Sequence, residues 1–311
     1  MKRAIVPALF IIAACSAGNA AQPSSSPSTP TAQAPQPASG VDGNRAFADL
    51  KAMVEIGPRP AGSPGIRQTR AFITRKMSEI GLTVSEQAFT ATTPVGQVPM
   101  ANLIVTLPGK RAERIIISSH YDTKPEKAFT FVGANDGGSS TALLIELARV
   151  LKDKPREFTY ELVFFDGEEA WGDWTSGNTF GSRHYVQAAR KAGTLMGVKA
   201  MILLDMIGER GVQLLQDTNS TGWLNDIFWR AAGSLGHQKA FLAGTTAVED
   251  DHKPFIDAGI PAIDLIDLDY VSWHTAEDTL DKIDPLSMKI VGDVVVAALP
   301  EVEKRLAAST R

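Results

Sequence analysis

The chain has 311 residues, which is enough for one large α/β domain or two small domains. Hydrophobic residues make up 44% of it and charged residues 21%, as is ordinary for a soluble globular protein. The formal net charge is -4, and the sequence has neither an excess of basic residues nor a run of acidic residues. Charge therefore indicates no nucleic-acid partner and no solvating tail, and the function has to be inferred from local sites.

The first residues resemble an export signal. The positive residues Lys2 and Arg3 precede an apolar run over residues 4–14, which is too short to span a bilayer because a span needs about 20 residues. The run leads directly to Cys15 in a sequence that resembles the lipobox of bacterial lipoproteins. We therefore expect a signal peptide over residues 1–14, cleavage before Cys15 and lipidation of its thiol. The alternative is a plain signal peptide that is cut nearby.

Residues 15–41 are expected to form a disordered tether. The segment is rich in Ser, Pro, Ala, Gln and Thr, so it cannot bury enough apolar surface to fold. Together with the leader it predicts export to a bacterial cell envelope and contact with a membrane through a lipid anchor only. Ser16, next to the lipidated cysteine, favours the outer membrane facing the periplasm, by resemblance to lipoprotein sorting. The folded part is expected over residues 42–311.

Beyond residue 42, helical and extended segments alternate. Apolar residues recur at helical spacing near residues 47–54 and 66–77, and at further helical stretches over 139–151, 183–191, 224–235 and 286–306. Five apolar runs have the length of strands, at residues 103–107, 115–118, 161–165, 200–204 and 262–266. Apolar strands that alternate with helices predict an α/β fold with a mostly parallel sheet covered on both faces. In such sheets, ligands gather at the carboxyl ends of the strands.

Residue types that bind metals follow most of the expected strands. Four of the five strands lead into acidic or histidine residues, namely His120, Asp122, Asp166, Glu168, Glu169, Asp205 and His274. A further acid, Asp136, lies just before a helix. Taken singly, such acids are more often caps or turn formers, and a lone histidine is more often structural. Taken together they indicate a zinc site, because carboxylates and imidazoles suit that metal. The pair Glu168-Glu169 fits, with one glutamate binding metal and its neighbour acting as general base or acid.

These residues belong to a series of motifs that resembles the zinc aminopeptidase superfamily. The motifs are Gly57-Pro58-Arg59-Pro60, His120-Tyr121-Asp122, Asn135-Asp136-Gly137, Glu168-Glu169, Leu204-Asp205, and His274-Thr275 with Asp278-Thr279-Leu280. Their order and number extend the resemblance from residue 42 to the C-terminus. The resemblance implies a three-layer α-β-α fold with a mostly parallel, mixed central sheet, as in the zinc aminopeptidases.

Within the superfamily, the chain most resembles the animal-type glutaminyl-peptide cyclotransferases. The details that carry this likeness are the run from Phe164 to Ala170 followed by Trp174, the run Glu249-Asp250-Asp251-His252, and Trp273 before His274. The resemblance implies cyclisation of an N-terminal glutamine of a peptide or protein to pyroglutamate, with release of ammonia. One departure from the animal enzymes is Asp264, which stands where they have a histidine.

The resemblance also assigns roles to individual residues. In a cyclase, one Zn2+ would be held by Asp136, Glu169 and His274, and Glu168 would move protons. Asp205 and Asp250 would hydrogen-bond the tetrahedral intermediate or the proton network, and Trp174 and Trp273 would line the substrate pocket. Asp122 and His252 would support the site from behind.

Two other functions remain open at this stage. In a two-zinc aminopeptidase, Asp136 would bridge two Zn2+ ions, His120 and Asp205 would complete the second site, and Asp122 would orient His120. A non-catalytic lipoprotein that only binds peptides or peptidoglycan is the third reading. Glu168 argues against this last reading, because a pure binder has no need of a free base beside a metal ligand.

Overall fold

The structure is a computed structural model that describes residues 39–309. The predicted signal peptide, Cys15 and almost all of the predicted tether lie outside these residues. The first helix, α1 (Gly43–Val54), is capped by Asp42, whose side chain accepts the backbone N–H groups of Asn44 and Arg45. Among the described residues, no helix is both long enough and apolar enough to cross a membrane.

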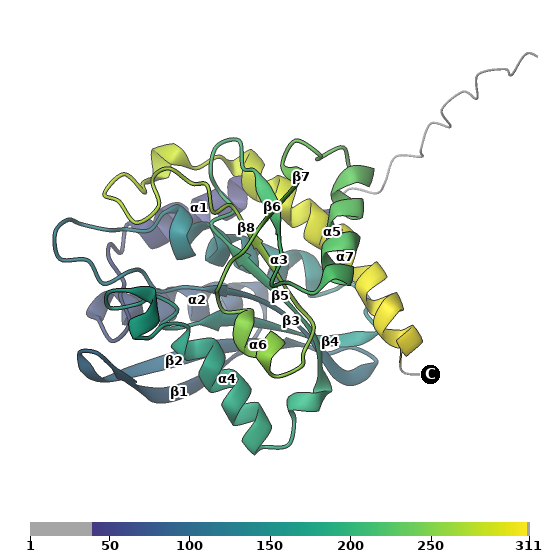
Figure 1. The fold of residues 1–311 in the computed structure, drawn as a ribbon, viewed down its shortest axis with the longest axis horizontal. Coiled ribbons are helices and arrows are strands. Elements are labelled where there is room, and N and C mark those ends of the chain that lie inside the picture. The colour runs from purple at the N-terminus through teal and green to yellow at the C-terminus, as the bar shows by residue number, and fades with distance from the viewer. Residues whose placement is uncertain (1–38, 310–311) are drawn as a thin grey trace, which may run out of the picture. The chain divides into compact units, whose positions relative to one another are not determined.

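A six-stranded sheet forms the centre of the fold (Figure 1). In spatial order its strands are β1 (Val84–Thr93), β2 (Gly96–Leu107), β4 (Phe158–Phe165), β3 (Arg111–His120), β5 (Val198–Asp205) and β8 (Ala262–Ile266). β1 and β2 form an antiparallel pair and β2 runs antiparallel to β4, whereas β4, β3, β5 and β8 are parallel. The mostly parallel, mixed sheet expected from the sequence is confirmed. The edge strand β1 was not predicted.

Helices cover both faces of this sheet. One core packs α1, α2 (Pro64–Ile80), α3 (Ser140–Leu151), α5 (Gly222–Ser234) and α7 (Pro285–Ser309) against one face, and the other core packs α4 (Phe180–Lys191) and α6 (Lys253–Asp257) against the other. The side chain of Ile115 belongs to the first core and that of the next residue, Ile116, to the second, because side chains alternate along a strand. The three-layer α-β-α fold is therefore confirmed.

Two short strands, β6 (Leu214–Asp217) and β7 (Phe241–Thr246), form a separate parallel pair, and neither was predicted.

The parallel strands bring their carboxyl ends to one edge of the sheet. His120, at the end of β3, pairs with Phe165, at the end of β4, and Asp205 ends the neighbouring strand β5. β2 runs in the opposite direction, so its own carboxyl end at Leu107 lies at the other edge. This explains why the first of the five predicted strands is the one that no metal-binding residue follows.

Candidate active site

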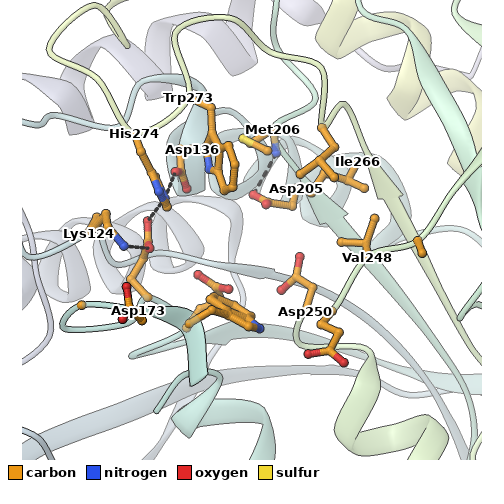
Figure 2. A pocket seen from close by; sticks show the side chains of 17 residues that line it. Lys124, Asp136, Asp173, Asp205, Met206, Val248, Asp250, Ile266, Trp273 and His274 are labelled. Carbon is orange, nitrogen blue, oxygen red and sulfur yellow. Dashed lines mark hydrogen bonds and ion pairs between the residues drawn. The ribbon is translucent and has the colours of Figure 1, made fainter. Parts of the chain in front are cut away.

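Asp136, Glu169 and His274 converge at this edge and could hold a metal ion, since one ligand atom of each lies within 4.8 Å of the others. His274 Nε2 lies 3.2 Å from Asp136 Oδ2 and 3.3 Å from Glu169 Oε1 (Figure 2). Both carboxylate oxygens are buried, yet neither takes part in a hydrogen bond. Ligands at about 2.1 Å from a tetrahedral zinc ion lie about 3.4 Å from one another. The spacing of the three side chains, and the two buried oxygens that accept no hydrogen bond, therefore fit a metal-ligand set.

The loop before α3 presents Asp136. Gly137 follows it with φ = 67°, a left-handed conformation that suits glycine. A Cβ atom on Gly137 would lie 2.8 Å from the imidazole ring of His120, so a larger residue would displace that side chain. His274 also has a positive φ, of 52°, which is uncommon outside glycine. Local backbone strain thus occurs at a proposed ligand.

A single carboxylate fixes the turn that follows β4. Asp122 accepts the backbone N–H groups of Glu168 and Glu169 at 3.1 and 3.2 Å. Its Oδ1 lies 3.5 Å from Nδ1 of His120, without a hydrogen bond at that nitrogen. Asp122 thus lies against His120, which the resemblance expects it to orient, and it also accepts the backbone N–H groups of both glutamates.

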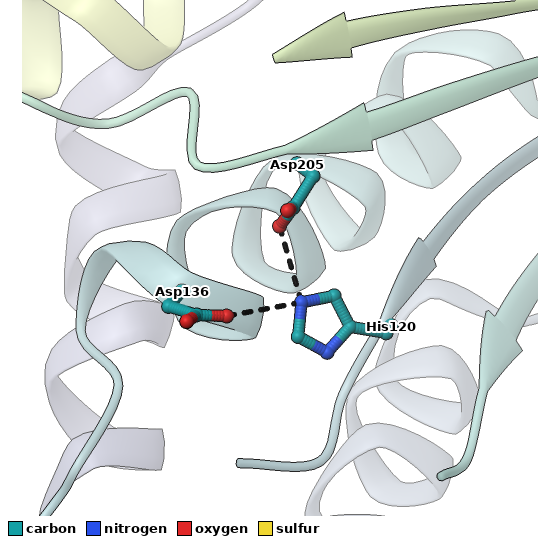
Figure 3. Close-up of side chains that lie close together, drawn as sticks. All are labelled: His120, Asp136 and Asp205. Atoms are coloured by element: carbon teal, nitrogen blue, oxygen red, sulfur yellow. Dashed lines mark hydrogen bonds and ion pairs between the residues drawn. The ribbon is translucent and has the colours of Figure 1, made fainter. Parts of the chain in front are cut away.

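His120, Asp136 and Asp205 form a second group of potential ligands. His120 Nε2 lies 3.1 Å from Asp205 Oδ1, in a hydrogen bond, and 3.3 Å from Asp136 Oδ1 (Figure 3). Asp205 Oδ1 also accepts the backbone N–H of Met206 at 2.8 Å. His120 Nε2 and Asp205 Oδ1 are therefore hydrogen-bonded within the protein, in contrast to the oxygens of Glu169.

Glu168 is buried beside this cluster, with 6% of its surface exposed. Burial raises its pKa well above the usual range; the charge of protonated His120 opposes this shift, and Asp250 adds to it. Burial and the neighbouring Asp205 and Asp251 likewise raise the pKa of Asp250. A raised pKa makes both carboxyl groups candidates for exchanging protons with a substrate.

A cavity of about 560 Å³ opens onto these residues. Trp174 and Trp273 both line it, and the ring of Trp273 lies 4.4 Å from that of His274. In Figure 2, Trp273 lies between His274 and Asp205. The volume is in the usual range for a small-molecule or peptide-end pocket.

The pocket also contains residues that sequence reasoning missed, namely Lys124, Asp173, Met206, Val248, Glu249, Ile266 and Leu268. Lys124 follows the predicted Asp122 by two residues, so its position in the chain could have suggested it. The apolar residues follow strands or precede α6, and nothing in their local pattern separates them from core residues.

His252 does not reach the pocket. It is fully buried, with Nε2 3.2 Å from Asp217 Oδ2 and Nδ1 3.7 Å from Asp264 Oδ2. Asp264, the departure from the animal enzymes, is also fully buried, and both of its carboxylate oxygens lack a hydrogen bond. Of the sequence-predicted site residues that the structure describes, all except His252 lie in the pocket or contact residues that line it.

Comparison with known proteins agrees with this arrangement. Residues 102–299 match the family model described as Peptidase family M28. A crystal structure of a glutaminyl cyclase from an Acidobacteriales bacterium is 38% identical, covers 90% of this chain and 100% of that chain, and superposes with a TM-score of 0.82. The glutaminyl cyclase of Porphyromonas gingivalis is 30% identical, covers 84% of this chain and 98% of that chain, and superposes with a TM-score of 0.76. The glutaminyl-peptide cyclotransferase of Bothrops jararaca is 32% identical over 267 residues, which are 73% of this chain and 72% of that protein.

The fold and the matched region define a member of peptidase family M28, within the zinc aminopeptidase superfamily. Inside that family, the chain belongs to the glutaminyl-peptide cyclotransferases, or glutaminyl cyclases. This confirms the family resemblance drawn from the motifs.

Proposed function

We propose that the protein is a glutaminyl-peptide cyclotransferase with a single zinc ion, which converts the N-terminal glutamine of peptides to pyroglutamate and releases ammonia. The observation that carries the proposal is the pair of buried oxygens of Asp136 and Glu169, which accept no hydrogen bond and face His274, with Glu168 and two tryptophans in the same pocket. The likeness to bacterial glutaminyl cyclases supports the same reaction.

Asp136, Glu169 and His274 would hold the zinc ion, which when bound supplies positive charge that polarises the γ-carbonyl group of the substrate. Glu168 takes a proton from the α-amine as the amine nitrogen bonds to the carbonyl carbon of the side-chain amide. Glu168 then gives that proton to the side-chain nitrogen as the old C–N bond breaks and ammonia leaves. No net proton is gained or lost, and the raised pKa of Glu168 suits a group that holds the proton between the two events.

The remaining pocket residues position the substrate. Trp174 and Trp273 give the pocket apolar walls, which favour the compact conformer in which the amine reaches the carbonyl carbon of the side-chain amide. Asp250 is buried and burial raises its pKa, which favours the protonated form, and in that form its carboxyl can donate a hydrogen bond to the tetrahedral intermediate. Asp205, paired with His120, completes the polar side of the pocket.

The product assay tests this proposal. Purified protein incubated with a peptide that begins with glutamine should release ammonia. The mass of the peptide should fall by the mass of one ammonia molecule, with no residue removed. Zinc, measured on the same sample, should reach one ion per chain at saturation. Release of a free N-terminal amino acid in place of ammonia would overturn the proposal.

A two-zinc aminopeptidase is the second candidate, because His120, Asp136 and Asp205 form a second potential ligand group. The hydrogen bonds that already pair Asp205 with His120 and Met206 favour the single-zinc reading. Two zinc ions per chain, together with release of the first residue, would favour the peptidase.

We also propose that Cys15 is lipidated and anchors the enzyme in the bacterial cell envelope, at the outer membrane facing the periplasm. The proposal rests on the leader and on Ser16. Labelling of cells with a radioactive fatty acid should mark the full-length protein, and Cys15→Ala should abolish the label. Label on the alanine variant would contradict the anchor.

A further inference from the structure

The loop of residues 132–137, which presents Asp136, is bound by a buried arginine that the proposed reaction does not use. Arg59 has no exposed surface. Its guanidinium donates to the carbonyl oxygens of Val132, Gly133 and Asp136 at 2.5, 2.8 and 3.3 Å. Its Nε donates to the carbonyl oxygen of Tyr121 at 3.0 Å, and Tyr121 stands between His120 and Asp122 in the chain. One side chain thus joins the two segments that present these site residues.

A buried aspartate binds the same loop through its backbone N–H groups, whereas Arg59 binds its carbonyl groups. Asp278, with 1% of its surface exposed, accepts the backbone N–H of Asn135 at 2.8 Å and that of Asp136 at 3.1 Å. The hydroxyl of Tyr270 donates to the same carboxylate at 2.8 Å. The loop carbonyls therefore bind a cation and the loop amides bind an anion.

The packing around Arg59 leaves little freedom. A Cβ atom on Gly133 or Gly138 would lie 3.4 Å from Arg59 Nη2, and one on Gly133 would lie 2.5 Å from the carbonyl oxygen of Asp136. Within residues 39–309, every hydrogen bond of the Arg59 side chain ends on a backbone carbonyl. The planar guanidinium thus fixes the positions of several carbonyl groups at once.

We propose that Arg59 and Asp278 are positioning residues that set the metal affinity of the site by fixing the backbone on both sides of Asp136. The inference rests on the metal site of the proposed function. The backbone at Asp136 has non-helical angles, so regular helix hydrogen bonds do not hold it, and its carboxylate stays beside His274 only if the loop is fixed by other groups. The Arg59–Asp278 pair holds the loop in the binding conformation before the metal arrives.

The test is the zinc affinity of the metal-free protein, measured by competition with a chromophoric chelator and without substrate. Arg59→Lys keeps the charge but not the planar fork that spans several carbonyls, and Asp278→Asn keeps the shape but replaces one acceptor by a donor. Each should weaken zinc binding by about 10- to 100-fold, the usual effect of losing a partner that orients a ligand. Because both residues act on one loop, the double variant should lose less than the product of the two single effects.

Arg67→Lys is the matched control. Arg67 is exposed and also donates to backbone carbonyls, those of Gly62 and Ser63. It should change zinc affinity by less than about twofold. Near-ultraviolet circular dichroism of each metal-free variant establishes that it is folded, and Asp278→Asn decides the question if Arg59→Lys does not fold.

Folded variants that bind zinc as tightly as the wild type, even with lowered Tm, would overturn the inference and leave the proposed function intact. Wild-type protein that binds no zinc would overturn both. Weaker zinc binding in the folded variants, with excess zinc restoring most of kcat, is the result that supports it.

Discussion

Asp122 Oδ1 accepts the backbone N–H of Glu168 at 3.1 Å. The second oxygen of the same carboxylate accepts the backbone N–H of Glu169 at 3.2 Å. The Asp122 side chain is almost fully buried, so these bonds are protected from water. The proposed proton carrier and a proposed metal ligand therefore take their positions from one carboxylate that itself does neither job.

Asp122→Asn should disturb both glutamates. Asparagine has nearly the same shape, but its NH2 group faces one of the two buried N–H groups and leaves it without an acceptor. We expect the free energy of unfolding to fall by about 1–3 kcal/mol, as for other buried donors left unpaired. We also expect kcat to fall. Urea unfolding and ammonia release measure the two effects. Asp153→Asn, at an exposed acid, is the control, and an unchanged kcat for Asp122→Asn would contradict this role.

Glu168→Gln should separate catalysis from metal binding. The amide retains the size of the side chain but cannot accept and return a proton, so kcat should fall by about 10²- to 10⁴-fold. Zinc content should be unchanged, because Glu168 is not among the three proposed ligands. Glu249→Gln is a matched control in the same pocket, with an expected loss of less than a few-fold. Full activity of Glu168→Gln would mean that another group moves the proton.

His120 and His274 should differ in their effect on zinc. His274→Ala removes a proposed ligand and should weaken zinc binding by more than about 100-fold, a larger effect than loss of a ligand's partner. His120→Ala removes the hydrogen bond to Asp205 and should leave one zinc ion per chain with less than tenfold change in affinity. The zinc content per chain and the zinc affinity of both variants are measured beside those of the wild type. A second zinc ion that disappears in His120→Ala would establish the two-zinc site.

The pattern of the sequence was sufficient for five of the six strands of the central sheet and for its active edge. Alternating residues such as Ile115 and Ile116 belong to two different cores, and acids follow the parallel strands, so His120 and Asp205 could be placed near one another. β1 escaped prediction because it is an edge strand: along residues 84–93 only two positions, Ala91 and Thr93, are buried, which is too few to give a clear period.

The supporting residues could not be predicted in the same way. Asp278 binds the backbone of Asn135, 143 residues away, and Arg59 binds a carbonyl 77 residues away, at Asp136. Contacts to backbone groups at such separations leave no periodic signal in the sequence. His252 was expected to support the site from behind; its imidazole faces Asp217 and Asp264, neither of which lines the pocket.

Trp273→Ala should weaken substrate capture more than it weakens metal binding. The Trp273 side chain lines the pocket with 44% of its surface exposed and stacks near His274. Loss of this apolar wall should raise KM for a glutamine peptide by about tenfold, which corresponds to about 1.4 kcal/mol. Trp273→Phe keeps an aromatic surface and should retain most of the wild-type kcat/KM. Zinc content should be equal in all three proteins, and a loss of zinc in the alanine variant would show instead that the ring supports His274.

Glu209 should make stability depend on pH. Burial and the neighbouring Asp267 raise the pKa of Glu209 to about 7, whereas an unfolded glutamate titrates near ~4.3. Between these values the folded state keeps a proton that the unfolded state releases. The penalty from Glu209 is therefore absent below the lower value, grows as pH rises between them, and is complete above about pH 7.

Glu209→Gln removes this penalty. Its advantage over the wild type in free energy of unfolding should be near zero at pH 4 and about 0.5–1 kcal/mol at pH 8, since the side chain is partly exposed and solvent screens the interaction. Urea unfolding of both proteins at a series of pH values gives the difference at each pH. Asp267→Asn removes the neighbouring charge. When both proteins carry Asp267→Asn, the effect of Glu209→Gln on the free energy of unfolding should therefore depend less on pH. A difference that stays constant from pH 4 to pH 8 would mean that Glu209 titrates as an ordinary surface glutamate and that its pair with Asp267 has no effect on stability.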